Sequence, residues 1–214
     1  MRDEIINELK KEIEACCKCK YILNTECNKP NVFVGKYYPK VMLIGHSPSV
    51  RVKEKAEVVL KMNQPNRALY KYIIEEILTP LQINVEELYC TNLMKCYTNN
   101  LPEEINKTDK KYIDNICNNC LDLLEREIEV IKPKLIISLS GRVFQIISKK
   151  YMGKKLELRD CFGKLHTLNI NNENIPYIPV VHIPKYKKIK EYYFPEQTKR
   201  LKAHGIKSIL KTMR

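Results

Sequence analysis

Four short apolar runs divide the chain, at residues 40–45, 85–91, 134–139 and 177–181. Runs of this length that are rich in Val, Ile, Leu and Tyr are typical of strands buried on both faces of a parallel sheet. Each run is followed directly by glycine or polar residues, which end strands and form loops. The pattern therefore predicts four buried strands, each with a polar loop at its carboxyl end.

Amphipathic segments between these runs predict helices, because apolar residues recur at three- and four-residue spacing. The predicted helices cover residues 4–15, 53–62, 68–78, 109–117, 120–131, 142–151 and 195–212. An apolar piece at 32–34 predicts a short edge strand, and the alternating, turn-rich stretch 155–175 predicts a hairpin or an irregular meander. Alternating strands and helices indicate an α/β fold, with three αβα layers around a doubly wound, four-stranded, mainly parallel sheet.

The four strand ends carry the candidate site loops, at residues 45–49, 92–96, 140–141 and 182–186. In a doubly wound parallel sheet these loops converge on one rim, where such sheets bind ligands. Asn92 comes at the end of the second strand, and its amide offers one acceptor and one donor that match the edge of a nucleobase. An Asn in this position is otherwise a common turn former.

With 214 residues, the chain has the length of one domain with a substantial core. Its formal net charge of +13, with 44% hydrophobic and 29% charged residues, excludes a mainly disordered chain and favours an acidic partner such as nucleic acid. The alternative is that all proteins of the organism are rich in Lys, Asn and Ile. In that case the positive charge is spread over the surface of this protein and forms no binding face. No stretch approaches the ~20 apolar residues of a membrane span, and the N-terminus is unlike a signal peptide, so we expect a cytoplasmic monomer without a membrane partner.

Nine cysteines in a chain expected in the cytoplasm favour metal or redox use over disulfides. Cys16 and Cys19 follow the first predicted helix at a two-residue interval, and Cys117 and Cys120 repeat that spacing. Two Cys-x2-Cys pairs form a zinc pattern, although their separation is longer than a compact zinc ribbon needs. Cys96, just beyond the second strand, is a further candidate ligand. In the structural alternative all nine are buried thiols.

Four motifs occur in a fixed order along the chain. They are Gly-x-x-Pro at residues 45–48, Thr-Asn-Leu-Met-Lys-Cys at 91–96, Cys-x12-Pro-Lys-Leu-Ile-Ile-Ser-Leu at 120–139 and Val-Val-His-x-Pro at 180–184. In this order the motifs resemble those of the uracil-DNA glycosylase superfamily, and most closely its family 4, whose members carry an iron-sulfur cluster. The resemblance runs from about Cys16 to Tyr186 and implies one glycosylase-like domain over residues 1–214.

The resemblance also implies a [4Fe-4S] cluster. Family 4 enzymes hold theirs with an N-terminal Cys-x2-Cys pair, a Cys after the Asn-bearing strand and a Cys that opens a helix. The positions that match in this sequence are Cys16, Cys19, Cys96 and Cys120. Four soft thiolates suit an iron-sulfur centre, and the cluster would tie the N-terminal segment 1–27 to the sheet. Zinc stays open as the alternative metal, and Cys17 or Cys117 as a substitute ligand.

The chemistry of the family implies cleavage of the N-glycosidic bond of uracil or another damaged base, flipped out of single- or double-stranded DNA in base excision repair. Asn92 matches the base-reading Asn, in a pocket that Gly45 and Pro48 help to form. His182 matches the histidine that stabilises the leaving base by donating a hydrogen bond. Four basic residues flank the site loops and are either contacts for the DNA backbone or an ordinary solvated surface: Arg51, Lys53, Lys185 and Lys187.

The first motif departs from the family pattern, which reads Gly-Glu-Ala-Pro-Gly. His46 stands at the position of the catalytic carboxylate and Ser47 at the next, and both are candidates to position water for attack on the sugar. The last motif reads His-Ile-Pro-Lys in place of His-Pro-Ser, and Tyr70 is a candidate for the base-stacking aromatic. The sequence supports an active glycosylase with an altered base or mechanism. It leaves open a non-catalytic binder of single-stranded or damaged nucleic acid, and a cluster protein that shares only the fold.

Overall fold

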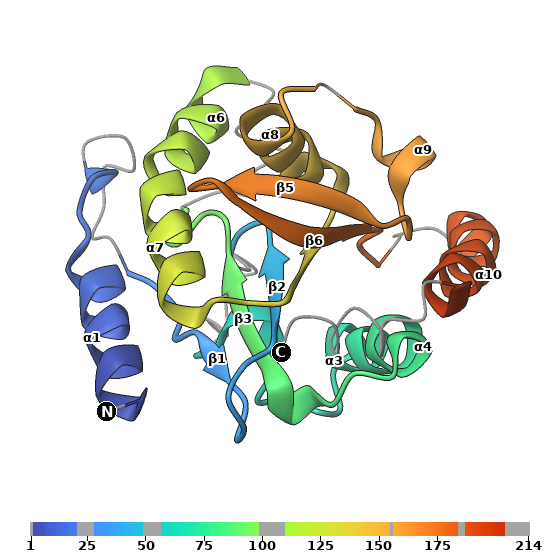
Figure 1. The fold of residues 1–214 in the computed structure, drawn as a ribbon, viewed down its shortest axis with the longest axis horizontal. Coiled ribbons are helices and arrows are strands. Elements are labelled where there is room, and N and C mark those ends of the chain that lie inside the picture. Colours follow the sequence, from blue (N-terminus) through green and yellow to red (C-terminus); the bar gives the residue numbers. More distant parts are fainter. Residues whose placement is uncertain are drawn as a thin grey trace.

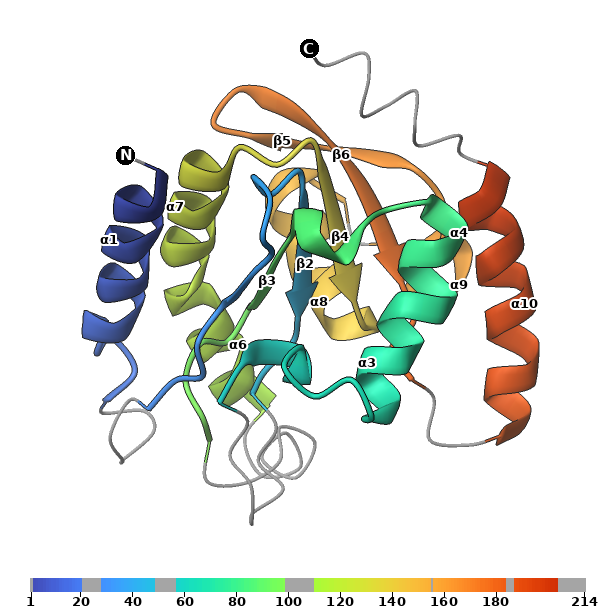
Figure 2. The same ribbon diagram turned by 90° about the horizontal axis from the view of Figure 1, so that it is seen from below.

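The computed structural model describes residues 2–20, 28–48, 57–98, 110–154, 156–183 and 187–203. Within these residues the fold is built on one six-stranded sheet in the order β1-β3-β2-β4-β6-β5. Figure 1 labels all of these strands except β4, which Figure 2 labels. The strands are β1 Phe33–Val34, β2 Val41–Gly45, β3 Leu88–Asn92, β4 Leu135–Leu139, β5 His166–Ile170 and β6 Glu173–Val180. The four central strands run parallel, and β1 and β5 pair antiparallel at the two edges. The predicted mainly parallel sheet of four buried strands is confirmed, with one antiparallel strand added at each edge.

The central strands are buried on both faces, as β2 illustrates. Val41 and Leu43 pack into one apolar cluster, whereas Met42 and Ile44 pack into the other. None of these four residues is exposed. Because neighbouring side chains of a strand point to opposite faces, a strand between two cores has no polar face and reads as a continuous apolar run.

Two groups of helices form the outer layers, as Figures 1 and 2 show. One face of the sheet is covered by α1 Arg2–Ala15, α6 Lys110–Asn119, α7 Leu121–Ile131 and α8 Gly141–Tyr151. The other face is covered by α10 Lys187–Ala203 and by a continuous helix made of α3 Ala68–Tyr72, the π-helical η2 Ile73–Leu78 and α4 Thr79–Leu81. Shorter elements are the 3₁₀ turns η1 Val59–Lys61 and η3 Val85–Glu87 and the one-turn helix α9 Leu158–Cys161. The three-layer αβα architecture is therefore confirmed.

The helix predicted at 68–78 continues past Pro80 to the end of α4. Its second part is π-helical, and Thr79 N–H donates to Ile74 O, a longer-range pairing that carries the backbone past the proline. The helix predicted at 53–62 is wrong over its described end, where η1 is a short 3₁₀ turn and Leu60 and Lys61 have positive φ angles of 53° and 54°. Residues 51–56 lie outside the described residues, and the strand predicted at 85–91 begins only after η3.

The C-terminal helix α10 begins at Lys187, not at Pro195 as predicted, and the proline lies inside it. Phe194 in the extra turns stacks on Tyr72 of α3, with 5.0 Å between the ring centroids. This aromatic pair anchors the turns that precede the proline, which removes one hydrogen bond from the helix interior. Residues 204–214 lie outside the described residues.

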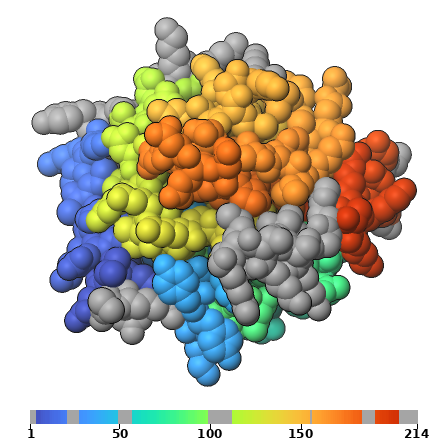
Figure 3. Space-filling model, in the orientation of Figure 1, coloured from blue at the N-terminus to red at the C-terminus, as the bar shows by residue number. Residues whose placement is uncertain are grey.

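A hairpin is formed by β5 and β6, orange in Figure 3. The hairpin predicted within 155–175 is therefore confirmed only in part, because its second strand is not separate from the predicted fourth strand but continues into it as β6. Its turn residues Asn171 and Asn172 have positive φ angles of 52° and 66°, which Asn tolerates better than most residues and which a tight hairpin turn requires. Within the described ranges, no helix has the length and apolar character needed to cross a membrane.

Candidate active-site rim and cysteine cluster

The carboxyl ends of β2 and β3 lie side by side, and this pairing brings the first two predicted site loops together. Gly45 and Asn92 are partners in the parallel register. The pairing continues past the strands, since Leu93 N–H donates to Gly45 O at 2.8 Å and Met94 N–H donates to His46 O at 2.8 Å. Asn92 and His46 therefore stand at one edge of the sheet, as the sequence predicts.

Asn92 occupies a position that only a glycine at residue 45 permits. Asn92 is 2% exposed, and its Oδ1 atom is buried without a hydrogen-bond partner. A Cβ atom at Gly45 would clash with this oxygen and with the side chain of Leu60. An unpaired buried amide oxygen costs free energy, so the arrangement suits a site in which a ligand completes the hydrogen bonding.

His46 follows the glycine and carries a neutral imidazole at neutral pH. Its pKa is lowered to about 4, mainly by burial and then by the positive charges of Arg142 and His182, while the carboxylate of Asp114 opposes the shift. The Nε2 atom of His46 is buried without a hydrogen-bond partner. A neutral imidazole has one N–H donor and one acceptor nitrogen, so His46 can orient a water molecule or the edge of a base.

His182 lies just beyond the end of β6, on the same edge of the sheet. Its side chain is exposed, and its Nδ1 atom is 3.4 Å from Ile183 O. The backbone before it is clamped, because Val181 N–H donates to Gln197 Oε1 at 2.9 Å and Tyr72 OH donates to Val181 O. Gln197 Nε2 donates in turn to Tyr72 OH at 3.2 Å. Two helices on one face of the sheet thus fix the segment from which His182 projects.

Arg142 and Asp114 also reach this rim, and the sequence analysis missed both. Arg142 lies in the first turn of α8, directly after β4, and forms an ion pair with Asp114 of α6. The position of Arg142 just after a predicted strand end could have identified it as a rim residue. Asp114 has no local signal, because it lies inside an amphipathic helix and reaches the rim only through packing.

Within the described residues, three buried side-chain nitrogen or oxygen atoms have no hydrogen-bond partner: His46 Nε2, Asn92 Oδ1 and Arg142 Nε. They belong to residues at or just after the carboxyl ends of β2, β3 and β4, and β2 lies between the other two strands. Buried polar atoms in proteins are nearly always paired, so three unpaired atoms in one region indicate a place where a ligand or water completes the bonding. The candidate active-site rim is therefore the edge of the sheet formed by these strand ends and that of β6.

The structure describes only some of the remaining predicted site residues. Ser47 is partly buried and Pro48 is buried in the loop after β2. Tyr70 packs against the apolar cluster on the α3 and α10 side of the sheet. Lys187 is the first residue of α10. Three predicted backbone contacts lie outside the described residues: Arg51, Lys53 and Lys185.

The four predicted metal ligands come from three segments that meet beside the loop after β3. Cys16 and Cys19 follow α1, Cys96 lies four residues beyond β3, and Cys120 lies between α6 and α7. A hydrogen bond from the Cys120 thiol lowers the pKa of Cys19 and raises that of Cys120, and the charges of Cys96 and Cys16 also act on Cys19. Asn119 Nδ2 donates to Cys19 Sγ at 3.7 Å. The structure therefore brings these four thiols into one region.

A set of four thiolates has the chemistry of a soft metal centre, either iron-sulfur or zinc. In the part of the chain that the structure describes, no three Cys, His, Asp or Glu side chains are arranged to hold one metal ion. Of the two alternative ligands, Cys17 is exposed, and Cys117 is fully buried with a pKa that burial raises to about 12. Cys90 and Cys161 are buried thiols, and Cys27 lies outside the described residues.

A buried ion pair joins the loop after β3 to α7. Lys95 Nζ contacts Glu127 Oε2 and donates to Thr91 Oγ1 at 2.7 Å. Glu127 Oε1 accepts hydrogen bonds from Thr91 Oγ1 at 2.7 Å and from Tyr89 OH at 2.9 Å. The side chains of Lys95 and Glu127 are 3% and 0% exposed, so each charge depends on these partners. Because Lys95 directly precedes Cys96, the network fixes the loop that connects the rim to the cysteine cluster.

The fold and the rim define a class, the open αβα proteins that bind ligands at the carboxyl ends of parallel strands. A family model described as the Uracil DNA glycosylase superfamily matches residues 33–197. The chain therefore belongs to the uracil DNA glycosylase superfamily, which confirms the resemblance found in its motifs.

Three relatives, each named Type-4 uracil-DNA glycosylase, are similar over most of the chain. The protein of Saccharolobus solfataricus is 30% identical over 173 residues, which cover 80% of this chain and 72% of the relative. The protein of Sulfurisphaera tokodaii is 24% identical over 83% of this chain and 73% of its own. The protein of Archaeoglobus fulgidus is 23% identical over 84% of this chain and 81% of its own. These similarities support the assignment to the family 4 type.

Proposed function

We propose that the protein is a DNA glycosylase that cleaves the N-glycosidic bond of uracil or another damaged base. The observation that carries the proposal is the pairing of Asn92 with Gly45 at the edge of the sheet where the neutral imidazole of His46 also stands, with the buried amide oxygen of Asn92 left unpaired. An amide presents a donor and an acceptor in one plane, as the edge of a pyrimidine does. A base with the wrong pattern would leave buried polar groups unpaired, so this arrangement selects among bases.

The reaction breaks the bond between the sugar C1′ atom and the base nitrogen, and the bonding electrons leave with the base. Water then attacks the positively charged sugar, forms the new C1′–O bond and gives one proton to solvent, while the departed base anion takes up one proton from solvent. The low pKa of His46 makes this histidine a weak base. A stronger base is not needed, because a water molecule that is already bonding to a cationic sugar is acidic. We therefore assign the orientation of this water to His46 and Ser47, and a hydrogen bond to the leaving base to His182.

We assign a [4Fe-4S] cluster to Cys16, Cys19, Cys96 and Cys120, with zinc as the alternative metal. The assignment is supported by the meeting of three separate segments at these thiols and by the hydrogen bond between Cys19 and Cys120. When bound, the cluster supplies a cross-link, because metal–thiolate bonds convert binding free energy into folding free energy. It would tie residues 1–27 to the sheet and make residues 1–214 one domain.

DNA, single- or double-stranded, is the partner that we assign to the rim. A formal net charge of +13 supports it, because the electrostatic attraction of phosphates supplies most of the affinity in non-specific binding. The assigned phosphate contacts flank the first and last site loops in the sequence: Arg51, Lys53, Lys185 and Lys187. Binding should weaken steeply as salt rises, since each neutralised phosphate releases counterions.

The second candidate function is that of a non-catalytic binder of single-stranded or damaged nucleic acid. The replacement of the family's carboxylate by His46 favours it. A neutral imidazole does not supply the fixed negative charge that would stabilise a cationic sugar. Such a protein would keep the base-reading pocket and the basic surface and lose only the chemical step.

Base release decides between the two functions. Oligonucleotides that contain uracil, hypoxanthine or no lesion are incubated, single- and double-stranded, with anaerobically purified protein of known iron content. We expect release of one modified base, and its loss in Asn92→Ala and His182→Ala. Asn169→Ala is the matched control, because Asn169 is exposed on the edge strand β5, on the hairpin side of the sheet.

Two results would contradict the glycosylase. No release by metal-loaded protein that still binds DNA would favour the non-catalytic binder. Release and DNA binding that are both untouched by Asn92→Ala would remove the pocket assignment, and with it the basis of both functions.

A further inference from the structure

Arg142 enters the rim from a strained turn at the end of β4. Ser140, the residue before α8, has a φ of 99° and a ψ of 151°, a region that residues other than glycine rarely adopt. Its N–H donates to Val180 O at 3.1 Å, and its Oγ accepts from Val143 N–H at 3.4 Å. The surrounding structure therefore holds a conformation that costs about 1–3 kcal/mol, which is typical of functional sites.

The place of β4 in the sheet sets what Arg142 can reach. β4 lies between β2, whose end carries His46, and β6, whose end carries His182. Arg142, three residues beyond the end of β4, is close enough to His46 to act on its protonation. Arg142 therefore follows a strand that lies between the two strands whose ends carry the candidate residues His46 and His182.

Asp114 engages only part of the guanidinium of Arg142. An Nη atom pairs with Asp114 of α6, while the Nε atom is buried without a hydrogen-bond partner. A guanidinium has five N–H donors in a fixed plane and stays charged at every pH at which proteins are folded. The carboxylate of Asp114 thus anchors this side chain, while its buried Nε–H leaves one hydrogen bond unmade.

Charge at the rim supports a role for this arginine. The imidazole of His46 is neutral at neutral pH, and the side chain of His182 is exposed to solvent. Arg142 brings a permanent positive charge to the described part of the rim, where it acts on His46, and the rim also holds the unpaired atoms of His46 and Asn92. A cation held in a partly buried site acts on a nearby negative charge more strongly than the same cation in water.

We propose that Arg142 is a catalytic residue, whose Nε–H and positive charge stabilise the negative charge that develops on the departing base, and that Asp114 is the residue that positions it. The inference rests on the proposed glycosylase function. As the C1′–N bond breaks, its electron pair moves onto the base, and the arginine receives this charge without transferring a proton. Arg142 thus stabilises the negative charge on the departing base more effectively than the exposed His182 does.

The test compares two leaving groups of different acidity. Single-turnover release is measured for uracil and for 5-fluorouracil, whose fluorine withdraws electrons and makes its anion easier to form. For Arg142→Gln we expect a loss of roughly 100-fold on uracil, as for removal of one oxyanion donor, and a clearly smaller loss on 5-fluorouracil, which needs less help. Arg142→Lys should be intermediate, because it keeps the charge and loses the planar N–H geometry.

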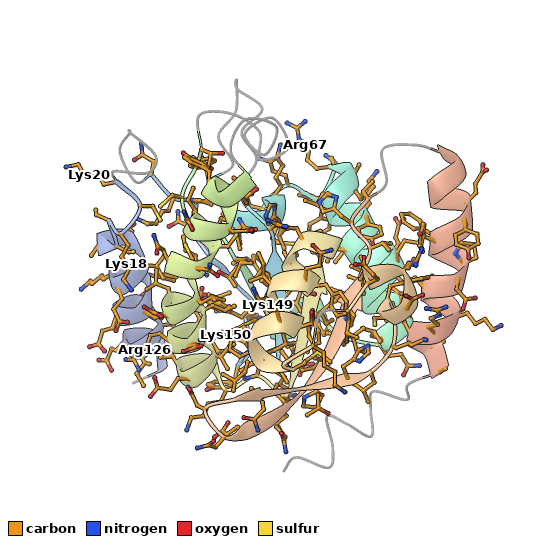
Figure 4. The ribbon with its side chains drawn as sticks, turned by 90° about the horizontal axis from the view of Figure 1, so that it is seen from above. Lys18, Lys20, Arg67, Arg126, Lys149 and Lys150 are labelled. Carbon is orange, nitrogen blue, oxygen red and sulfur yellow. The ribbon has the colours of Figure 1, made fainter. Side chains whose placement is uncertain are left out.

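Two further variants sharpen the comparison. Asp114→Asn should reduce release less than Arg142→Gln and with the same preference for the better leaving group, because the arginine stays but loses its anchor. Arg126→Gln is the matched control: Arg126 lies on the side of α7 that faces α1 (Figure 4), where its partners are Glu12 and Glu129. It should release both bases as the wild type does.

An equal loss on both substrates would show that Arg142 only supports the fold and would overturn the inference. Unchanged release by Arg142→Gln would overturn it as well. If the wild type releases neither base, the proposed activity on uracil fails, and the inference fails with it. That outcome is distinguishable, because it is seen before any variant is compared.

Discussion

Asn92 Oδ1 lies so close to the position of a Cβ atom at residue 45 that the two would clash. The two residues are register partners at the ends of β2 and β3. The side chain that we assign to base reading is thus positioned by the absence of a side chain on the neighbouring strand.

Gly45→Ala should therefore displace the amide of Asn92 and reduce base release about as much as Asn92→Ala does. The added methyl group also meets Leu60, and overpacking of this kind costs about 1–3 kcal/mol of stability. Release rates and denaturant unfolding are measured together. Gly153→Ala is the control, since its φ of 64° makes alanine strained there while nothing lies within 4 Å of the new Cβ atom. Wild-type release by Gly45→Ala would contradict the assigned pocket.

The low pKa of His46 predicts that stability falls in acid. The unfolded chain binds a proton at this residue near pH 6.5, whereas the folded protein binds it only near pH 4. Between these values the unfolded state holds more protons, so the free energy of unfolding decreases as the pH drops from 6.5 to 4. The loss is about 2–3 kcal/mol, allowing for partial exposure of the ring.

Urea unfolding of wild type and His46→Gln at several pH values between 4 and 7 measures this loss. Other groups, including any metal ligands, titrate in both proteins, so the difference between the two pH profiles isolates His46. We expect a shallower profile for the variant. Parallel profiles would show that His46 is not held neutral by the fold.

The buried pair of Lys95 and Glu127 predicts a strong effect of a single substitution. Lys95→Met should lower the free energy of unfolding by about 3–5 kcal/mol, because it leaves a buried carboxylate without its cation. Lys95→Met combined with Glu127→Gln should recover much of this loss, since an uncharged amide oxygen still accepts from Tyr89 and Thr91. Chemical denaturation of the two variants in the same metal state gives both values. If the double variant lost at least as much free energy of unfolding as Lys95→Met alone, the pairing of Lys95 with Glu127 would be contradicted.

The cysteine cluster predicts which thiols hold metal. Serine at Cys16, Cys19, Cys96 or Cys120 should reduce bound iron, measured together with sulfide and visible absorption, from about four atoms per chain. Cys17→Ser should keep the full content, because Cys17 is exposed. Zinc in the wild type, in place of iron and sulfide, would establish zinc as the metal. Loss of metal in Cys117→Ser would show that Cys117 is a ligand in place of one of the four assigned cysteines.

Much of the rim follows from local sequence. The strand ends at Gly45 and Asn92 were readable because a strand buried on both faces is marked by an uninterrupted apolar run and by the polar residues that end it. The helices on either side were readable from their apolar spacing. The two prolines inside helices, Pro80 and Pro195, were misread, because a local rule for helix ends does not register a π-helical turn or an aromatic contact made 122 residues away in the chain, such as that of Tyr72 with Phe194.

The sequence by itself determined the layered α/β fold, the family and the residue types at the strand ends, because periodicity and motif order are properties of neighbouring residues. Only the tertiary structure decided that Asp114 anchors Arg142, that Lys95 is buried against Glu127 and that His46 is neutral. Each of these depends on groups brought together from distant segments. Charge, burial and hydrogen bonding are set by such neighbours in space, and no local pattern of the chain records them.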